Sequence, residues 1–70
     1  MYYLACCDDS RRCFGFLRND KTISTDPGAD MDKLMSFKTK RETSEIVMQI
    51  NLSHMLMANG IPYRVAAVKG

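Results

Sequence analysis

Short apolar runs separated by polar turns open the chain. Residues 2–7 are apolar throughout, residues 12–18 contain two Phe and a Leu, and residues 22–25 read TIST. The intervening stretches contain Asp, Asn and Ser, whose side chains bond to the nearby backbone in tight turns. This pattern predicts three strands of an antiparallel meander.

A loop and an ambiguous segment follow the meander. Residues 26–30 read DPGAD, in which Pro sets φ and Gly tolerates positive φ, so they predict a loop. Residues 31–37 are compatible with a short strand and with one helical turn, and the sequence leaves both open. Near the end of the chain, residues 63–69 predict one further strand.

The helix has the most clearly marked start in the chain. Thr39 and Glu42 match the capping box, in which the Thr hydroxyl and the Glu carboxylate each bond a free backbone N–H. Apolar residues then recur with helical spacing over residues 40–58. Asn59 and Gly60 predict the end of the helix, because Gly60 can adopt the left-handed conformation that commonly closes helices.

The order of these elements predicts an α+β fold. Residues 1–70 are expected to form a single domain of two layers. One layer is a small antiparallel β-sheet made of the β-meander and the final strand. The other layer is one α-helix that lies across a face of this sheet.

The predicted helix carries two apolar stripes. At about 100° per residue, one side holds Ile46, Val47, Ile50, Met57 and Ala58. The opposite side holds Met48, Leu52, Met55 and Leu56. Only one side of a helix can cover a small sheet, so the second stripe is expected to bind a partner, either another protein or a second copy in a homodimer. The alternative is a monomer with some exposed apolar residues, which folded surfaces commonly have.

The first predicted strand raises the same question. Its two faces are both apolar, and they consist of Tyr2, Leu4 and Cys6 on one side and Tyr3, Ala5 and Cys7 on the other. An antiparallel sheet with one solvated side normally alternates apolar and polar residues. Either residues 31–37 cover the second face of the sheet, or that face is another contact surface.

Composition narrows the functional classes. The chain is 46% hydrophobic and 26% charged, which is typical of a globular domain, and its net charge of +2 does not by itself favour a nucleic-acid or membrane partner. No apolar run reaches the roughly 18 residues of a membrane span, and the apolar start lacks the basic residues of a signal peptide, so a cytoplasmic location is expected. The sequence has no evident acid/base carboxylate pair or Gly-rich phosphate loop, so we expect no enzymatic activity.

Three cysteines and the single histidine are the strongest candidates for chemistry. Without a secretion signal, reduced thiols are expected instead of a disulfide framework. A two-residue hairpin loop would place Cys6 opposite Cys13, and a three-residue loop would place Cys7 there. Two of these thiols, together with His54 on the helix, would supply three of the four ligands of a tetrahedral zinc ion.

The predicted zinc site therefore consists of Cys6, Cys7, Cys13 and His54. Its fourth ligand stays open between the other hairpin cysteine, Asp8, water and a second subunit. Zinc would also contribute folding free energy to a chain this small. The alternative is a set of buried reduced thiols and a histidine that packs in the core.

Residues 12–17, which read RCFGFL, resemble the first RNA-contacting motif of RNA-recognition domains, K/R-G-F/Y-G/A-F-V-x-F/Y. The matching positions are Arg12, Phe14, Gly15 and Phe16. The resemblance implies bases stacked on aromatic rings and phosphates held by basic side chains. The candidate residues are Tyr3, Phe14, Phe16, Lys38, Lys40 and Arg41. A small module that binds RNA or single-stranded nucleic acid is therefore the alternative function.

As a whole, the chain resembles small accessory proteins of bacteriophages. The resemblance lies in the short meander, the step Phe37-Lys38-Thr39 with Glu42 into one helix, and the closing strand. Among such proteins, the inhibitors of bacterial defence nucleases (anti-CRISPR proteins) are small, mostly non-enzymatic and often dimeric. The resemblance implies a module that blocks a large effector, such as a CRISPR nuclease, by steric occupation inside a bacterial host cell.

Overall fold

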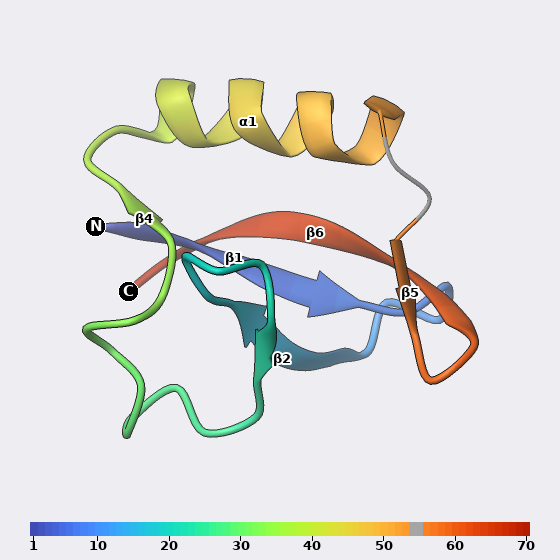
Figure 1. Ribbon diagram of the computed structural model, residues 1–70. Coiled ribbons are helices and arrows are strands. Elements are labelled where there is room, and N and C mark those ends of the chain that lie inside the picture. Colours follow the sequence, from blue (N-terminus) through green and yellow to red (C-terminus); the bar gives the residue numbers. More distant parts are fainter. Residues whose placement is uncertain (54–55) are drawn as a thin grey trace.

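A computed structural model of the chain describes residues 1–53 and 56–70. In chain order its elements are β1 (Tyr2–Cys7), β2 (Cys13–Leu17), β3 (Ile23–Ser24), β4 (Ser36–Phe37), α1 (Lys40–Ser53), β5 (Leu56–Ala58) and β6 (Ile61–Lys69). Figure 1 shows α1 lying across one face of an antiparallel sheet in which β1 and β6 are the long strands. The predicted α+β fold is confirmed.

The two loops of the meander use the same turn. After β1, the Arg11 N–H donates to the Asp8 carbonyl over 3.0 Å, and Arg11 has a φ of 64°. After β2, the Lys21 N–H donates to the Arg18 carbonyl over 2.9 Å, and Lys21 has a φ of 68°. A left-handed residue directly after a turn is typical of three-residue hairpin loops. In both loops an aspartate carboxylate accepts a backbone N–H from two residues further on, which is the turn chemistry that the sequence predicts.

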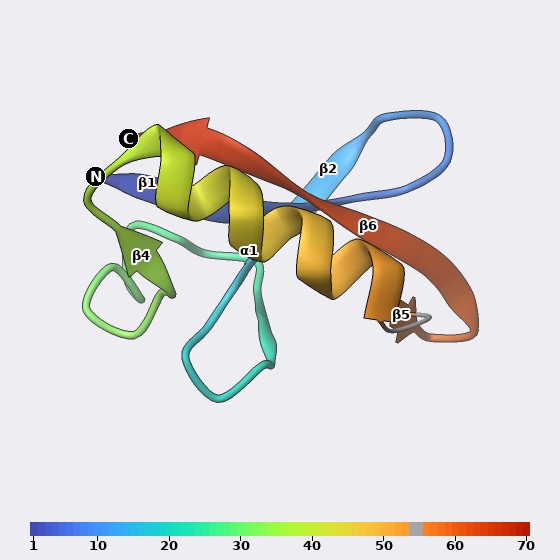
Figure 2. The same ribbon diagram turned by 90° about the horizontal axis from the view of Figure 1, so that it is seen from above.

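The strands lie in the order β3-β2-β1-β6-β5, and β4 pairs with the start of β1. The segment of residues 31–37 contains both a turn and a strand: the Leu34 N–H donates to the Asp30 carbonyl over 3.1 Å, and β4 then pairs with β1, with Phe37 opposite Tyr2. The sheet also brings the two ends of the chain together, because the Gly70 N–H donates to the Met1 carbonyl over 3.0 Å. Both Figure 1 and Figure 2 show the termini side by side at one end of the molecule.

The end of the helix differs from the prediction. α1 ends at Ser53, and residues 56–58 form β5, so the predicted helix over residues 40–58 is wrong in its last part. Asn59 has a φ of 53° and Gly60 a φ of 79°, which is the two-residue turn that joins tightly twisted hairpin strands. This turn pairs β5 with β6 and places Leu56 opposite Tyr63. Pairing with β6 supplies backbone hydrogen bonds and apolar burial that together outweigh the helical spacing.

The core lies between α1 and the sheet. Its buried residues come from three strands: Leu4, Cys6, Leu17, Tyr63 and Val65. Ile46, Val47 and Ile50 of α1 pack against them, which confirms that this stripe is the one facing the sheet. The capping box is confirmed on the Thr39 side, where the hydroxyl Oγ1 accepts the Glu42 N–H over 3.2 Å. In the described part of the chain, no helix has the length and apolar character that a membrane crossing requires.

Candidate functional site

The side of α1 that faces away from the sheet is fully solvated and carries two apolar side chains. Leu52 is 80% exposed and Met48 is 62% exposed. These residues are four positions apart, so their side chains are neighbours on the helix surface. We call Met48 and Leu52 the outer patch. In Figure 1 this side of α1 points upward, away from the strands.

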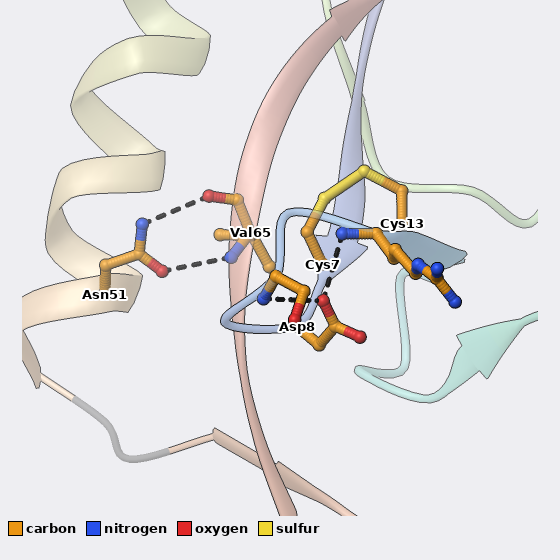
Figure 3. The surroundings of a disulfide bond; sticks show 7 residues. Cys7, Asp8, Cys13, Asn51 and Val65 are labelled. Atoms are coloured by element: carbon orange, nitrogen blue, oxygen red, sulfur yellow. Dashed lines mark hydrogen bonds between the residues drawn. A yellow bond between two sulfur atoms is a disulfide. The ribbon is translucent and has the colours of Figure 1, made fainter.

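Two polar side chains mark the inner side of the helix, and one of them, Asn51, fixes the rotation of the helix relative to the sheet. Thr43 is completely buried, and its hydroxyl Oγ1 donates to the Thr39 carbonyl over 2.7 Å. The Asn51 amide forms two hydrogen bonds of 3.1 Å with Val65 of β6, donating from Nδ2 to the carbonyl and accepting the N–H at Oδ1. Figure 3 shows this pair of bonds between α1 and β6. Rotating the outer patch into the core would break both Asn51 bonds to β6 and would bring the buried Thr43 side chain out to solvent.

The rest of the outer side of α1 is polar. Arg41 Nε lies 3.8 Å from Glu45 Oε1, and the two side chains are 92% and 66% exposed. An exposed ion pair of this kind contributes little to stability. The apolar part of the surface is therefore limited to the C-terminal half of the helix, with charged side chains one turn before it.

Leu56 does not belong to the outer patch. It lies on β5 and packs against the core, so its prediction as a partner-binding residue is wrong. The physical reason is that the chain leaves the helix before Leu56, and the strand that follows turns this side chain inward opposite Tyr63. Met55, the remaining member of the predicted stripe, lies outside the described residues.

The cysteines occupy opposite faces of β1. Cys7 lies opposite Cys13, as the three-residue loop predicts, and the two form a disulfide, so the expectation of reduced thiols is wrong for this pair. Figure 3 shows the disulfide joining β1 to the start of β2. Cys6 points into the core and is a free thiol with no exposed surface. Burial raises the pKa of the Cys6 thiol to about 11, which keeps it protonated and inert at neutral pH.

This arrangement separates the predicted zinc ligands. Zinc binds thiolates, and neither Cys7 nor Cys13 has one while the disulfide is formed. Cys6 points to the other side of the sheet because neighbouring residues of a strand face opposite ways. Among the residues that the structure describes, no three His, Cys, Asp or Glu side chains lie close enough to hold a metal ion. His54 is outside those residues, and zinc binding by the reduced chain stays a prediction.

A wide hollow of about 610 Å³ lies beside the disulfide. Its lining includes Arg11 from the first hairpin loop and Arg64 from β6, where Arg64 lies directly opposite Cys7. The Asp8 carboxylate at its rim is used by the loop, since Oδ1 accepts the N–H groups of Ser10 (2.9 Å) and Arg12 (3.0 Å). With the disulfide intact, this hollow offers cations but no thiolate nucleophile.

The two phenylalanines of the predicted nucleic-acid surface are directed differently. A register shift between Cys6 and Cys7 lets Phe14 pack edge-on against the core residue Tyr63, with ring centroids 5.7 Å apart. Phe16 lies opposite Ala5, on the sheet face away from α1. The remaining predicted residues comprise half-buried Tyr3 and the exposed basic side chains Lys38, Lys40 and Arg41. The structure therefore does not bring Phe14 and Phe16 together as one stacking surface.

Asn51 is the residue that sequence reasoning missed. Its side chain joins α1 to the backbone of β6 by two hydrogen bonds. A signal for it exists in the sequence, because Asn51 is a polar residue four positions after Val47, beside the apolar residues of the inner side of the helix. An amide at such a position requires a buried donor and acceptor.

No protein family, curated protein or solved structure matched the chain. Function is therefore inferred from the geometry of the outer patch and the sheet.

Proposed function

We propose that this protein is a small, non-enzymatic protein-binding module whose contact surface is the outer patch. The observation that carries the proposal is the 80% exposure of Leu52, beside Met48, on a helix that is anchored from its other side. The Asn51 bonds to β6 hold the helix in a rotation that keeps both apolar side chains in water. An exposed pair presented on a fixed helix is suited to insertion into an apolar groove of a partner.

The energetics of the outer patch fit a focused contact. Burying a leucine side chain contributes about 2 kcal/mol, and binding energy usually concentrates in a few central residues of an interface. Methionine is flexible and adapts to the shape of a partner surface. Arg41 and Glu45, one to two turns earlier, provide a charged rim.

For the partner we propose a large bacterial effector of the CRISPR nuclease type, on the resemblance to phage inhibitors in size and architecture. The mechanism is steric: the module covers a surface that the effector needs. A cytoplasmic location in the bacterial host belongs to this proposal. The disulfide between Cys7 and Cys13 is an observation against it, since disulfides are more typical of oxidising compartments.

The test is binding of the full chain to a panel of purified RNA-guided nucleases, measured by biolayer interferometry. Leu52→Asp is expected to lower the affinity at least tenfold, because it places a charge in the centre of the apolar contact. Gln49→Asp is the matched control, because Gln49 is exposed on the same helix beside the patch, and it is expected to retain binding. Circular dichroism checks that both variants are folded.

Two results would contradict the proposal. The first is the absence of binding to every nuclease in the panel. The second is an equal loss of affinity in Leu52→Asp and Gln49→Asp. Binding of single-stranded oligonucleotides with a steep fall in affinity at higher salt would instead support the nucleic-acid alternative.

A further inference from the structure

The C-terminal half of β6 has an open backbone edge. Residues 64–69 pair with β1 along one edge of the strand, whereas β5 pairs only with residues 61–63 along the other. In the described part of the chain, no strand lies along the second edge beyond residue 63. Figure 2 shows this half of β6 at the rim of the sheet, next to the C-terminus.

One position on this edge is already occupied. The Asn51 amide binds both the N–H and the carbonyl of Val65, just as a neighbouring strand would. Backbone groups of alternate residues in a strand point to opposite edges. Ala67 and Lys69 therefore direct their N–H and carbonyl groups to the same edge as Val65, and these two donors and two acceptors have no partner among the described residues of the chain.

The side chains around these groups do not protect the edge. Natural edges are usually blocked by charges, proline, a bulge or a covering element. Here Ala66 and Ala67 are small and exposed, and Lys69 is the single charged residue from 66 to 69. Short side chains let a second backbone approach to hydrogen-bonding distance, so the edge is suited to strand addition.

We propose that a second copy of this chain pairs with this edge, β6 against β6 in antiparallel orientation, centred on Val68. In this register Ala67 lies opposite Lys69 of the second copy, and Lys69 opposite Ala67 of the second copy. All four free backbone groups of each chain are then used in four intermolecular hydrogen bonds, and the Val65 groups held by Asn51 are not required. A register centred on Ala67 would use half of these groups and would bring Lys69 of the second copy against the Asn51 amide.

The side chains agree with the Val68-centred register. Val68 is 36% exposed and lies opposite Tyr3, on the sheet face away from α1. At the symmetry axis it would meet Val68 of the second copy, and β-branched cross-strand pairs stabilise antiparallel sheets. The two Lys69 residues are offset along the strands, so like charges do not lie directly opposite each other.

This pairing has a consequence for the outer patch. A two-fold axis perpendicular to the sheet keeps both α1 helices on the same side of one continuous sheet. The dimer would present two outer patches in the same direction, so it could engage two sites of a partner or two partners at once. The pairing itself does not depend on the outer patch or on the proposed function.

The experiment is the molecular mass in solution as a function of concentration, measured by sedimentation equilibrium. The wild-type chain is expected to move from 8.0 kDa towards twice this mass as concentration rises. Ala67→Pro removes an N–H that has no partner strand within the described chain and is expected to stay at the monomer mass. Ala67→Ser keeps this N–H and is the matched control, which is expected to dimerise.

A second measurement avoids mutation altogether. Hydrogen exchange of the wild-type chain should slow at the Ala67 and Lys69 amides as concentration rises, and should be unchanged at the Ala66 amide, which faces β1. A monomer at every concentration, with fast exchange at both edge amides, would overturn the proposal. So would a dimer that survives Ala67→Pro but is lost in Leu52→Asp, because that dimer would use the outer patch.

Discussion

The two sides of α1 carry the same kinds of apolar residue in opposite surroundings. One side faces the interior above the sheet, and the other faces solvent. Ile50 packs against the core, whereas Leu52, two residues later, is 80% exposed. Helical propensity and hydrophobicity do not separate these residues. What separates them is the rotation of the helix, which the Asn51 bonds to Val65 and the packing of the inner side against the core hold in place. The apolar residues of this helix that pack against the core are therefore those that share a side with Asn51 and the buried Thr43.

The largest expected effect on stability is the difference between two truncations, one on each side of α1. Ile50→Ala should lower the free energy of unfolding by about 2 kcal/mol, because it leaves a partly filled space against the core. Leu52→Ala should change it by no more than about 0.5 kcal/mol, because the side chain is already in water. Urea unfolding followed by circular dichroism measures both values. Equal losses in the two variants would show that the two sides of the helix do not differ as described.

A smaller effect is expected from the anchor between α1 and β6. Asn51→Ala removes both hydrogen bonds to Val65 and should lower the free energy of unfolding by about 1.5 kcal/mol. Gln49→Ala, an exposed change two residues earlier, should be close to neutral and is the control. The same unfolding experiment applies. If Asn51→Ala proves as mild as the control, the rotation of α1 is held by apolar packing alone.

An effect that is absent at neutral pH concerns the two faces of β1 and appears only at high pH. Burial raises the pKa of Cys6 from the ordinary value of 9.0 to about 11, so the unfolded thiol ionises at lower pH than the folded one. The contribution of Cys6 to stability is therefore complete below pH 9 and is lost as the pH rises towards 11. Melting temperatures between pH 8 and pH 11 should fall more steeply in the wild-type chain than in Cys6→Ala.

Thiol labelling completes the comparison of the two faces at neutral pH. Iodoacetamide should leave the native chain unmodified, since Cys6 is buried and Cys7 and Cys13 are joined. After reduction, two alkyl groups should be found by mass spectrometry, on Cys7 and Cys13. Modification of Cys6 in the folded chain would mean that the interior is more accessible than its burial indicates.

Local signals were sufficient for most elements. The meander, the start of the helix after Thr39 and the grouping of Ile46, Val47 and Ile50 on one side of the helix all follow from turn chemistry, capping and the period of the helix. These features depend on residues at most a few positions apart. That this side of the helix is the inner one comes from the structure. The candidate site was predicted in part: Met48 and Leu52 lie on the outer side as expected, and Leu56 does not, because β5 replaces the end of the helix.

By itself, then, the sequence determined the class of the fold, where the helix begins, and which of its residues share a side. Only the tertiary structure decided where the helix ends, since Asn59 and Gly60 are compatible with a helix cap and with a hairpin turn, and pairing with β6 selects the turn. It also decided that Cys7 meets Cys13, and that Asn51 occupies the edge of β6 at Val65. The physical reason is the same in each case. A residue that could adopt several local conformations adopts the one that lets it pair with a strand far away in the sequence. Only folding of the whole chain brings that strand close.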